Sequence, residues 1–420
     1  MSNFRRRLLG LITPEDYYSY GVEWDTSQTS PDLKRIGNMA LHRTLPVQSQ
    51  IKGCLLDDKG NVVKYLNESD WTSETRDGSQ GQVMIELPKH YEKFETSGTI
   101  RRVFLSTYPL VGYTEIPKAY VGAYLATVQR STSKLCSVVN TSTDYRGGNN
   151  DRGSDSDVYW SFLGRPATNI NSTDFRTYAR NRGNGVHWNK MCYHIYKEIL
   201  WMYVVEYASF NIQKPYNTNL TDEGYHQGGL GYGAAYSASG FNPHNWYPFI
   251  PCGYSDSLGN GSGIVSYQAT SSVKVDVPRY RGMENLYSQS WQWTDGIIFK
   301  MSSGVNDIYV TSDPSQYKDN SVEGYTKIGS GYYGSTDEGW IKNILFGDSG
   351  DPVPIEFGGS DSTYYSDYAW IYPSSSATYR VFAFGANSNL GSQGGVFSFD
   401  SGNVASYATA NFGSRLCFIP

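Results

Sequence analysis

The stretch YRVFAFGANSNLGSQGGVFSFDSGNVASYATANFGSRLCFIP, residues 379–420, closes the chain and combines two kinds of position. Apolar residues and glycines recur along it, as in strands and tight turns that enclose a core. These framing residues are Val381, Phe384, Gly385, Gly391, Gly394, Val396, Phe397, Gly413 and Leu416. Small polar residues stand between them and offer adaptable hydrogen-bond donors and acceptors, a mixture typical of binding surfaces. The pattern therefore favours a binding face over a reaction centre.

The composition of the whole chain limits its class. Its 420 residues carry a formal net charge of −5, whereas a nucleic-acid-binding domain presents a basic face. Aromatic residues make up 15% of the chain, which is too many for a disordered protein. No apolar run is long enough to cross a membrane, and the run Leu8 to Ile12 is too short for a secretory signal. We therefore expect a globular protein without nucleic-acid binding or membrane insertion.

Metal and cofactor sites are not expected. The five cysteines are far apart and form no C-x-x-C pair, so we predict small apolar thiols in a protein folded in a reducing cytosol. They are Cys54, Cys136, Cys192, Cys252 and Cys417. The polar loop 140–157 carries Asp151, Asp155 and Asp157. An EF-hand that began at Asp151 would need a carboxylate at Phe162, so we interpret this segment as a solvated loop.

Short apolar runs separated by turn signals predict strands in the N-terminal part. Ile51–Leu56 and Val62–Leu66 flank the turn D-D-K-G-N and predict a hairpin. Residues 78–87, 103–105, 120–128, 308–311 and 339–346 are further strand-like runs.

Two segments have the features of helices. Residues 173–182 predict a short helix that stops at Gly183. Residues 189–209 carry apolar side chains at helical spacing and predict the one long helix. Glu206 falls on or beside the apolar stripe of that helix, so it needs a cationic partner, for which Arg180 and Arg182 are the candidates.

Three motifs in the second half of the chain carry a family resemblance. They are R-G-x-E-N-x-x-x-x-x-W-x-W-x-D-G at 281–296, G-G-S-x-x-x-Y-Y-x-D-Y at 358–368, and the final F-G-A-N-S-N-L-G-S-Q-G-G-V-F with G-S-R-L. Together they resemble the C-type-lectin-like fold in its formylglycine-generating-enzyme variety. The resemblance implies an α+β domain over residues 81–420. An N-terminal attachment arm (1–20) and a small β-rich region (21–80) would precede it.

Within that fold the pattern is similar to structural and receptor-binding fibre proteins of gut bacteroidetes phages and to variable proteins diversified by retroelements. In those proteins the polar positions of the last segment contact the ligand. The resemblance transfers this role to Asn387, Ser388, Asn389, Gln393, Ser398, Phe399, Asp400, Ser401, Asn403 and Tyr407. The segment is rich in Ser and Gly where a diversified one is rich in Asn, so the resemblance does not extend to diversification by a retroelement.

Three enzymatic alternatives lack residues that they need. Formylglycine-generating oxidases use a cysteine pair, and no second cysteine accompanies Cys417 in the C-terminal region. The G-D-S-G-D-P turn at 347–352 is close to the serine-protease motif, but no histidine stands in a matching context. Glu284, Asp295, Asp367 and Asp400 offer carboxylates for a glycosidase, yet no spacing pairs them. We interpret Asp295 as an acceptor for turn backbone, and the W-x-W pair as core.

The resulting hypothesis is a non-catalytic virion protein assembled in the host cytoplasm, a tail or head fibre or tip that binds the host cell surface. Its ligand would be a cell-surface glycan or protein held on the 387–407 face. Residues 1–20 would attach to other virion proteins. Weak individual contacts imply multivalent display, so we expect a homo-oligomer, with a trimer favoured. The alternatives are a purely architectural virion protein (head fibre or baseplate part) and a bacterial lectin-like surface adhesin.

Overall fold

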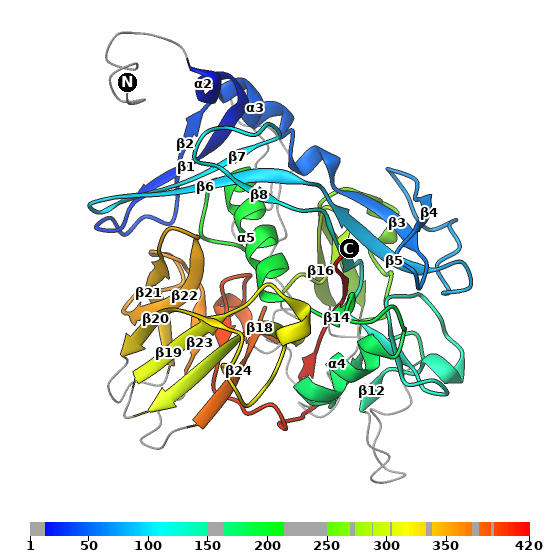
Figure 1. The fold of residues 1–420 in the computed structure, drawn as a ribbon. Coiled ribbons are helices and arrows are strands. Elements are labelled where there is room, and N and C mark those ends of the chain that lie inside the picture. The colour runs from blue at the N-terminus through cyan, green and yellow to red at the C-terminus, as the bar shows by residue number, and fades with distance from the viewer. Residues whose placement is uncertain are drawn as a thin grey trace.

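The structure is a computed structural model that describes residues 13–149, 163–213, 250–268, 274–287, 289–302, 305–332, 338–371, 378–387 and 390–420. A five-stranded, a six-stranded and a nine-stranded sheet surround one central helix, α5 (Figure 1). The N-terminal end, with helices α2 (Pro14–Tyr18) and α3 (Met39–Thr44), lies at the top of the view. Asp151, Asp155 and Asp157 lie outside the described residues.

The five-stranded sheet forms the upper part of the molecule, in the order β2-β1-β7-β6-β8. All its neighbouring strands are antiparallel. The strands are β1 (Ser19–Asp25), β2 (Lys34–Gly37), β6 (His90–Ser97), β7 (Ile100–Ser106) and β8 (Thr114–Ile116). The predicted strand 103–105 is confirmed within β7.

The six-stranded sheet joins the first hundred residues to the end of the chain, in the order β14-β27-β9-β5-β3-β4. The strands are β3 (Lys52–Leu56), β4 (Val62–Tyr65), β5 (Gln82–Leu87), β9 (Ala119–Gly122), β14 (Trp188–Lys190) and β27 (Leu416–Phe418). The predicted hairpin is confirmed as β3 and β4. Its turn needs Gly60, whose φ is +85° and where a side chain would run into the ring of Phe418.

The nine-stranded sheet curls on itself. Its path β20-β19-β18-β24-β25-β23-β21-β22, with β26 beside β18, brings the edge strands β20 and β22 back into contact, so it forms a nearly closed barrel. The strands are β18 (Trp291–Ser302), β19 (Val305–Val310), β20 (Thr326–Tyr332), β21 (Glu338–Phe346), β22 (Asp351–Phe357), β23 (Tyr368–Trp370), β24 (Thr378–Phe384), β25 (Phe399–Asp400) and β26 (Phe412–Gly413).

Three small sheets complete the described strands. They are β10 (Thr127–Gln129) with β11 (Lys134–Cys136), β12 (Gly148–Asn149) with β13 (Ala167–Thr168), and β15 (Gly263–Gln268) with β16 (Lys274–Tyr280) and β17 (Met283–Glu284). The predicted short helix is confirmed as α4 (Ser172–Arg180). Its first turn is capped by Asn171, whose side chain accepts from the Asp174 amide at 2.8 Å.

The predicted long helix is confirmed as α5 (Tyr193–Tyr207). It begins later than predicted because residues 188–190 pair as β14 with β27. All its residues except His194 and Lys197 are buried, so it is a core helix covered on every side. Its tyrosines also hydrogen-bond to their surroundings. For example, the Tyr196 hydroxyl donates to the Val396 carbonyl at 3.0 Å. None of the helices in the described ranges is long and apolar enough to span a bilayer.

The predicted α+β class, and with it the C-type-lectin-like fold, is wrong. Strands hold 40% of the residues and helices 15%, and the described ranges contain only four α-helices. The physical reason lies in α5. An α+β fold segregates helices into a layer on a sheet, whereas the single long helix here is enclosed by sheets. The fold is therefore β-rich.

The residues on either side of the expected boundary at residue 80 share sheets. Strand β1 pairs with β7, and β3 pairs with β5. The C-terminal stretch adds β24, β25 and β26 to the nearly closed barrel and β27 to the six-stranded sheet. Its framing residues Val381, Phe384, Val396, Phe397 and Leu416 are buried, as predicted.

Three buried titratable groups interact between α5 and β6. Nε2 of His90 lies 3.1 Å from a carboxylate oxygen of Glu92, and Glu198 of α5 interacts electrostatically with both. Burial raises the pKa of the Glu198 carboxyl to about 8. Burial lowers the pKa of His90, but Glu92 more than compensates, so the pKa of the imidazole is raised.

We expect the free energy of unfolding to fall as the pH rises from about 5 to 8. The Glu198 carboxyl keeps its proton in the folded protein over this range but ionises in the unfolded chain, so its stabilising contribution is lost on the way to pH 8. Glu198→Gln should flatten this dependence by on the order of 1 kcal/mol per pH unit, measured by urea unfolding at pH 5, 6.5 and 8. Glu323→Gln, at a side chain that is 84% exposed, is the control. Equal slopes for Glu198→Gln and the wild type would contradict the assignment.

Candidate functional site

The structure divides the predicted ligand-contacting residues into two groups. Asn387, Ser398, Phe399, Asp400 and Ser401 are buried. Gln393 and Asn403 are half-buried, and Tyr407 is 42% exposed. Ser388 and Asn389 lie outside the described residues. The buried members serve the fold, since Ser398, for example, donates to the Gln393 carbonyl at 2.7 Å. Any contact with an outside molecule therefore falls on Gln393, Asn403, Tyr407 and their neighbours.

Those neighbours include a continuous row of aromatic rings, which we call the aromatic strip. It runs from β21 to the segment before β26, and successive ring centroids are 4.7–6.2 Å apart. Its members in order are Trp340, Tyr368, Trp370, Trp291, Phe412 and Tyr407. Trp291 and Phe412 are buried, whereas the three rings at one end and Tyr407 at the other reach the surface. The strip is thus a half-exposed aromatic surface on a buried aromatic base.

Sheet register gives Trp370 two acidic neighbours. Trp370 is the pairing partner of Glu338 on β21 and of Asp400 on β25. Partners on adjacent strands present their side chains to the same face of a sheet. The indole of Trp370 makes no hydrogen bond within the part of the chain that the structure describes. The middle of the strip therefore combines a flat ring with carboxylates on both sides.

Asp400 and Asn403 form a rigid polar edge beside the strip. One carboxylate oxygen of Asp400 accepts from the Gly402 amide at 2.8 Å, and both accept from Nδ2 of Asn403 at 3.1 Å. Burial raises the pKa of Asp400 to about 6. Burial and the charge of Asp400 both raise the pKa of Tyr407. Oδ1 of Asn403 and the Tyr407 hydroxyl make no hydrogen bonds with any described residue.

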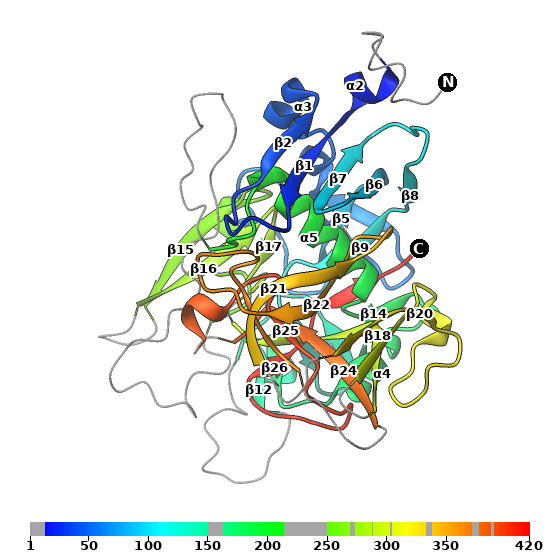
Figure 2. The same cartoon turned by 90° about the vertical axis from the view of Figure 1, so that its left-hand side faces the viewer.

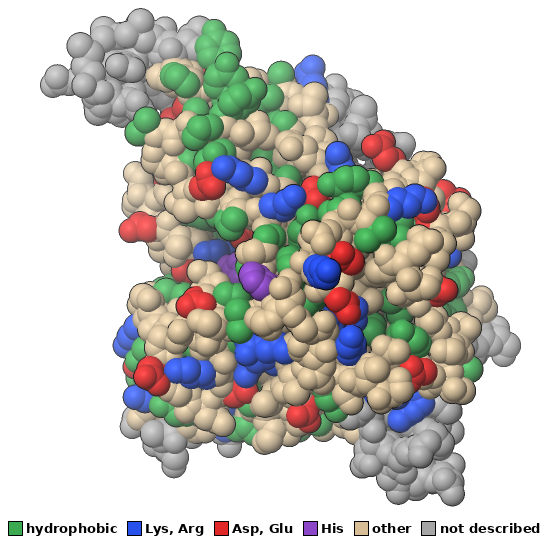
Figure 3. All heavy atoms as spheres, turned by 45° about the vertical axis from the view of Figure 1, so that its right-hand side comes forward, with side chains coloured by type: hydrophobic (Ala, Val, Ile, Leu, Met, Phe, Trp, Pro, Cys, Tyr) green, Lys and Arg blue, Asp and Glu red, His purple; other side chains and the backbone are tan. Residues whose placement is uncertain are grey.

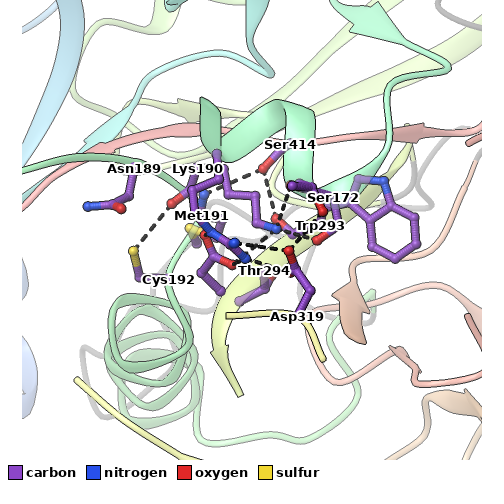
Figure 4. A network of polar contacts seen from close by, with 12 residues as sticks. Ser172, Asn189, Lys190, Met191, Cys192, Trp293, Thr294, Asp319 and Ser414 are labelled. Atoms are coloured by element: carbon purple, nitrogen blue, oxygen red, sulfur yellow. Dashed lines mark hydrogen bonds and ion pairs between the residues drawn. The ribbon is translucent and has the colours of Figure 1, made fainter. Parts of the chain in front are cut away.

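Figure 4 shows part of a second network of polar contacts. Its charged residues are buried. The guanidinium of Arg176 binds Asp295 at 2.5 and 2.9 Å and Asp319 at 2.6 and 2.9 Å. Nζ of Lys190 lies 3.1 Å from Asp295 and bonds to Ser172. Two cations and two carboxylates leave the cluster neutral overall. Burial lowers the pKa of Lys190, whereas Asp295 and Asp319 overcome the same effect on Arg176 and raise its pKa.

This cluster ties α4 and β14 to β18, and it corrects the interpretation of Asp295 as an acceptor for turn backbone. A lysine with a lowered pKa beside a carboxylate is also what a catalytic pair requires. None of the four charged side chains is more than 9% exposed, so a substrate has no access to them in this structure. The cluster acts as a structural ion-pair network.

The enzymatic alternatives find no support in the described residues. The Ser349 hydroxyl donates to Asp351 at 2.6 Å rather than to an imidazole. Of the four carboxylates weighed for a glycosidase, Asp367 accepts from the Phe397 amide and Glu284 from Ser255, while Asp295 and Asp400 are bound as described above. All four are buried. Each is held by its own local partners and none faces another across a groove.

The structure brings a second cysteine to Cys417. The thiols of Cys192 and Cys417 interact, although the two residues are far apart in the sequence. Both are fully buried, and burial raises the pKa of Cys192 well above its ordinary value, the opposite of what a redox-active thiol needs. All five cysteines are buried and free, in agreement with their prediction as small apolar residues.

The predicted partners of Glu206 are wrong. Its carboxylate binds Arg281 at 2.6 and 3.0 Å and the Tyr280 hydroxyl at 3.1 Å. Arg180 instead donates to the Pro314 carbonyl, and Arg182 binds Asp58. The described residues contain no group of three or more His, Cys, Asp or Glu side chains placed to hold a metal ion.

Comparison with known proteins adds no relative. No known protein family matches the chain, and no curated protein matches its sequence significantly. The candidate site therefore rests on its own geometry, and the sequence had already singled out Asp400, Asn403 and Tyr407 within it.

Proposed function

We propose that the chain is a non-catalytic structural protein of a phage virion that binds the host cell surface through the aromatic strip. The observation that carries this proposal is that two different surfaces lie at opposite ends of the molecule. Helices α2 and α3 lie at one end, and β24, beside the strip, lies in the opposite half in both views (Figures 1 and 2). One end is thus free to bind while the other attaches.

The attachment end has its own apolar surface. Tyr17, Tyr18 and Tyr108 are 56%, 44% and 52% exposed, and the rings of Tyr18 and Tyr108 lie 4.4 Å apart. Figure 3 shows hydrophobic side chains gathered at this end of the molecule. Exposed apolar patches mark interaction sites in soluble proteins. They support attachment of the chain to a neighbouring virion protein through residues 1–20 and the surface beside them.

The strip is built as a binding surface is expected to be. The segment that carries Asp400, Asn403 and Tyr407 is anchored in two sheets through β24 to β27. Asn403 and Tyr407 lie on the connection between β25 and β26, so this connection is held by a strand at each of its ends. Each contact on such an open surface is weak, so useful adhesion calls for a homo-oligomer, and a trimer is the form we propose.

The proposal predicts that the protein is found on virions and binds host cells. Antibodies against the purified chain should label intact phage particles in immunogold micrographs. Excess purified chain should slow phage adsorption to its bacterial host in a plaque-based adsorption assay. Absence of the chain from particles, together with unchanged adsorption, would contradict the proposal.

Two variants separate the two ends of the molecule. Tyr18→Ser/Tyr108→Ser should reduce incorporation into particles and leave cell binding of the free chain intact. Tyr407→Ala should have the reverse effect. Incorporation without any cell binding by the wild type would instead indicate an architectural virion protein. Recovery of the chain on the surface of uninfected cells would indicate a bacterial adhesin.

A further inference from the structure

We infer that the ligand of the aromatic strip is an uncharged carbohydrate chain. This inference rests on the proposed function and names the chemical class of its receptor. It is argued from the rings, from the polar edge beside them and from the charges on either side.

Each ring supplies an apolar face of the kind that sugars cover, with neighbouring rings tilted by 84° between Trp340 and Tyr368 and by 49° between Tyr368 and Trp370. One face of a pyranose is made largely of C–H groups, which pack against the negative face of an aromatic ring. Trp340, Tyr368 and Trp370 follow one another at centroid distances of 5.4 and 4.7 Å and are only half-buried. Three consecutive rings suit an extended chain of sugar units better than a single compact ligand.

The polar edge supplies fixed partners for hydroxyl groups. Asp400 and Asn403 are locked to each other by hydrogen bonds of 3.1 Å, so they need no further ordering when a ligand binds. Oδ1 of Asn403 and the hydroxyl of Tyr407 make no bond to any described residue, and both can pair with sugar hydroxyls. Such pre-set planar groups beside an aromatic ring select a polyhydroxylated ligand over a purely apolar one.

The charges on either side select against acidic sugars. Glu338 and Asp400 are the cross-strand neighbours of Trp370. Like charges brought together at an interface are strongly unfavourable, so a uronic acid or sialic acid over Trp370 is disfavoured. The ligand is therefore a neutral glycan.

Affinity electrophoresis of the full chain tests the inference. Gels containing dextran, mannan or galactan are the neutral probes, and polygalacturonate is the anionic probe. We expect retardation by at least one neutral polysaccharide and none by polygalacturonate. Trp370→Ala should lower the affinity about tenfold or more, and Trp370→Phe should recover part of it because a ring remains. Retardation by polygalacturonate alone, or by no neutral probe, would overturn the inference.

Further variants keep a folding defect from being mistaken for lost binding. Tyr407→Ala changes an exposed side chain and should also weaken retardation, whereas Tyr108→Ala changes another exposed tyrosine at the other end and should not. Each variant is compared with the wild type by its thermal unfolding temperature. Unchanged retardation in both Trp370→Ala and Tyr407→Ala would overturn the assignment to the strip.

Cell binding distinguishes this inference from the proposed function. Periodate, which cleaves the vicinal diols of sugars, should abolish binding of the chain to host cells, and protease treatment of the cells should not. The opposite result would identify a protein receptor, so the inference would fail while the proposed function stands. Retardation by a neutral polysaccharide without any binding to cells would leave the inference standing and remove the proposed function.

Discussion

Arg415→Met should cost at least about 3 kcal/mol of the free energy of unfolding, because it leaves several buried acceptors without donors. Arg415 lies between β26 and β27 and is fully buried. Its guanidinium makes five hydrogen bonds and has no carboxylate partner among them. The acceptors are the side-chain oxygen of Gln292 and the main-chain carbonyls of Gly122, Ala123, Glu284 and Asn285.

Two effects oppose each other at this site. Burial of an unpaired cation is unfavourable, and it lowers the pKa of Arg415 to about 10. Replacement of a buried charge by an apolar side chain is harmless where its partners are replaced as well. Four of the five acceptors here are main-chain groups that no substitution removes; one of them, the Ala123 carbonyl, also accepts from the Glu284 amide at 2.8 Å and stays paired. Unpaired acceptors at about 1–3 kcal/mol each therefore outweigh the relief from burying the charge.

Urea unfolding measures the difference. Arg415→Lys should also destabilise, since an ammonium has three donors and cannot reproduce the planar fork. Arg43→Met, at an exposed arginine of α3, is the matched control and should change stability by no more than about 0.5 kcal/mol. A urea midpoint for Arg415→Met equal to that of the wild type would show that the network around Arg415 does not hold the six-stranded and nine-stranded sheets together.

Local patterns along the sequence were sufficient for the elements but not for their assembly. The hairpin around Gly60, the capped helix α4 and the apolar helix α5 each follow from signals within about twenty residues. The pairing of β14 with β27 joins residues 188–190 to residues 416–418, and no local signal reports it. The predicted fold class was wrong for the same reason. The sequence of α5 is equally compatible with a helix enclosed by sheets and with a helix in a layer of helices.

The candidate site shows the same limit. The polar positions of the last segment were identified, yet alternation alone could not separate buried Ser398 from exposed Tyr407. Trp340 was missed as a member of the strip because sheet register brings it to Tyr368, whereas Tyr368 and Trp370 stand only two residues apart on β23. Glu206 was correctly expected to need a cation. Its partner Arg281 comes from a distant turn, and no local pattern along the sequence selects it among the other arginines.

The network around Arg176 gives the second large effect: Arg176→Met should destabilise the protein by about 3–5 kcal/mol at pH 7. The substitution leaves the buried carboxylates of Asp295 and Asp319 with Lys190 as their remaining charged partner. A surface ion pair behaves differently. Lys342 and Glu356 lie 2.6 Å apart but are 37% and 47% exposed, so Lys342→Ala should cost no more than about 1 kcal/mol.

The pH dependence of this variant separates a charge effect from a packing defect. In the wild type Lys190 and Arg176 overcome burial and lower the pKa of Asp319, so this contribution to stability is present at neutral pH and is lost as the pH falls. Without Arg176 the Asp319 carboxyl stays buried and loses its hydrogen-bonded cation, which raises its pKa and favours protonation. The deficit of Arg176→Met should therefore shrink between pH 7 and pH 4.

A double-mutant cycle completes the argument. Asp319→Asn alone removes one partner of Arg176, whereas in the Arg176→Met background it removes an unpaired buried charge. Asp319→Asn should therefore cost less stability in the Arg176→Met background than in the wild type, or should even stabilise the protein. The coupling energy should be about 1–3 kcal/mol. Urea unfolding at pH 7 and pH 4 supplies all four corners of the cycle. Additive effects and a deficit independent of pH would mean that Arg176 acts through packing, and the neutral network of two cations and two carboxylates would lose its role in fixing α4 to the sheets.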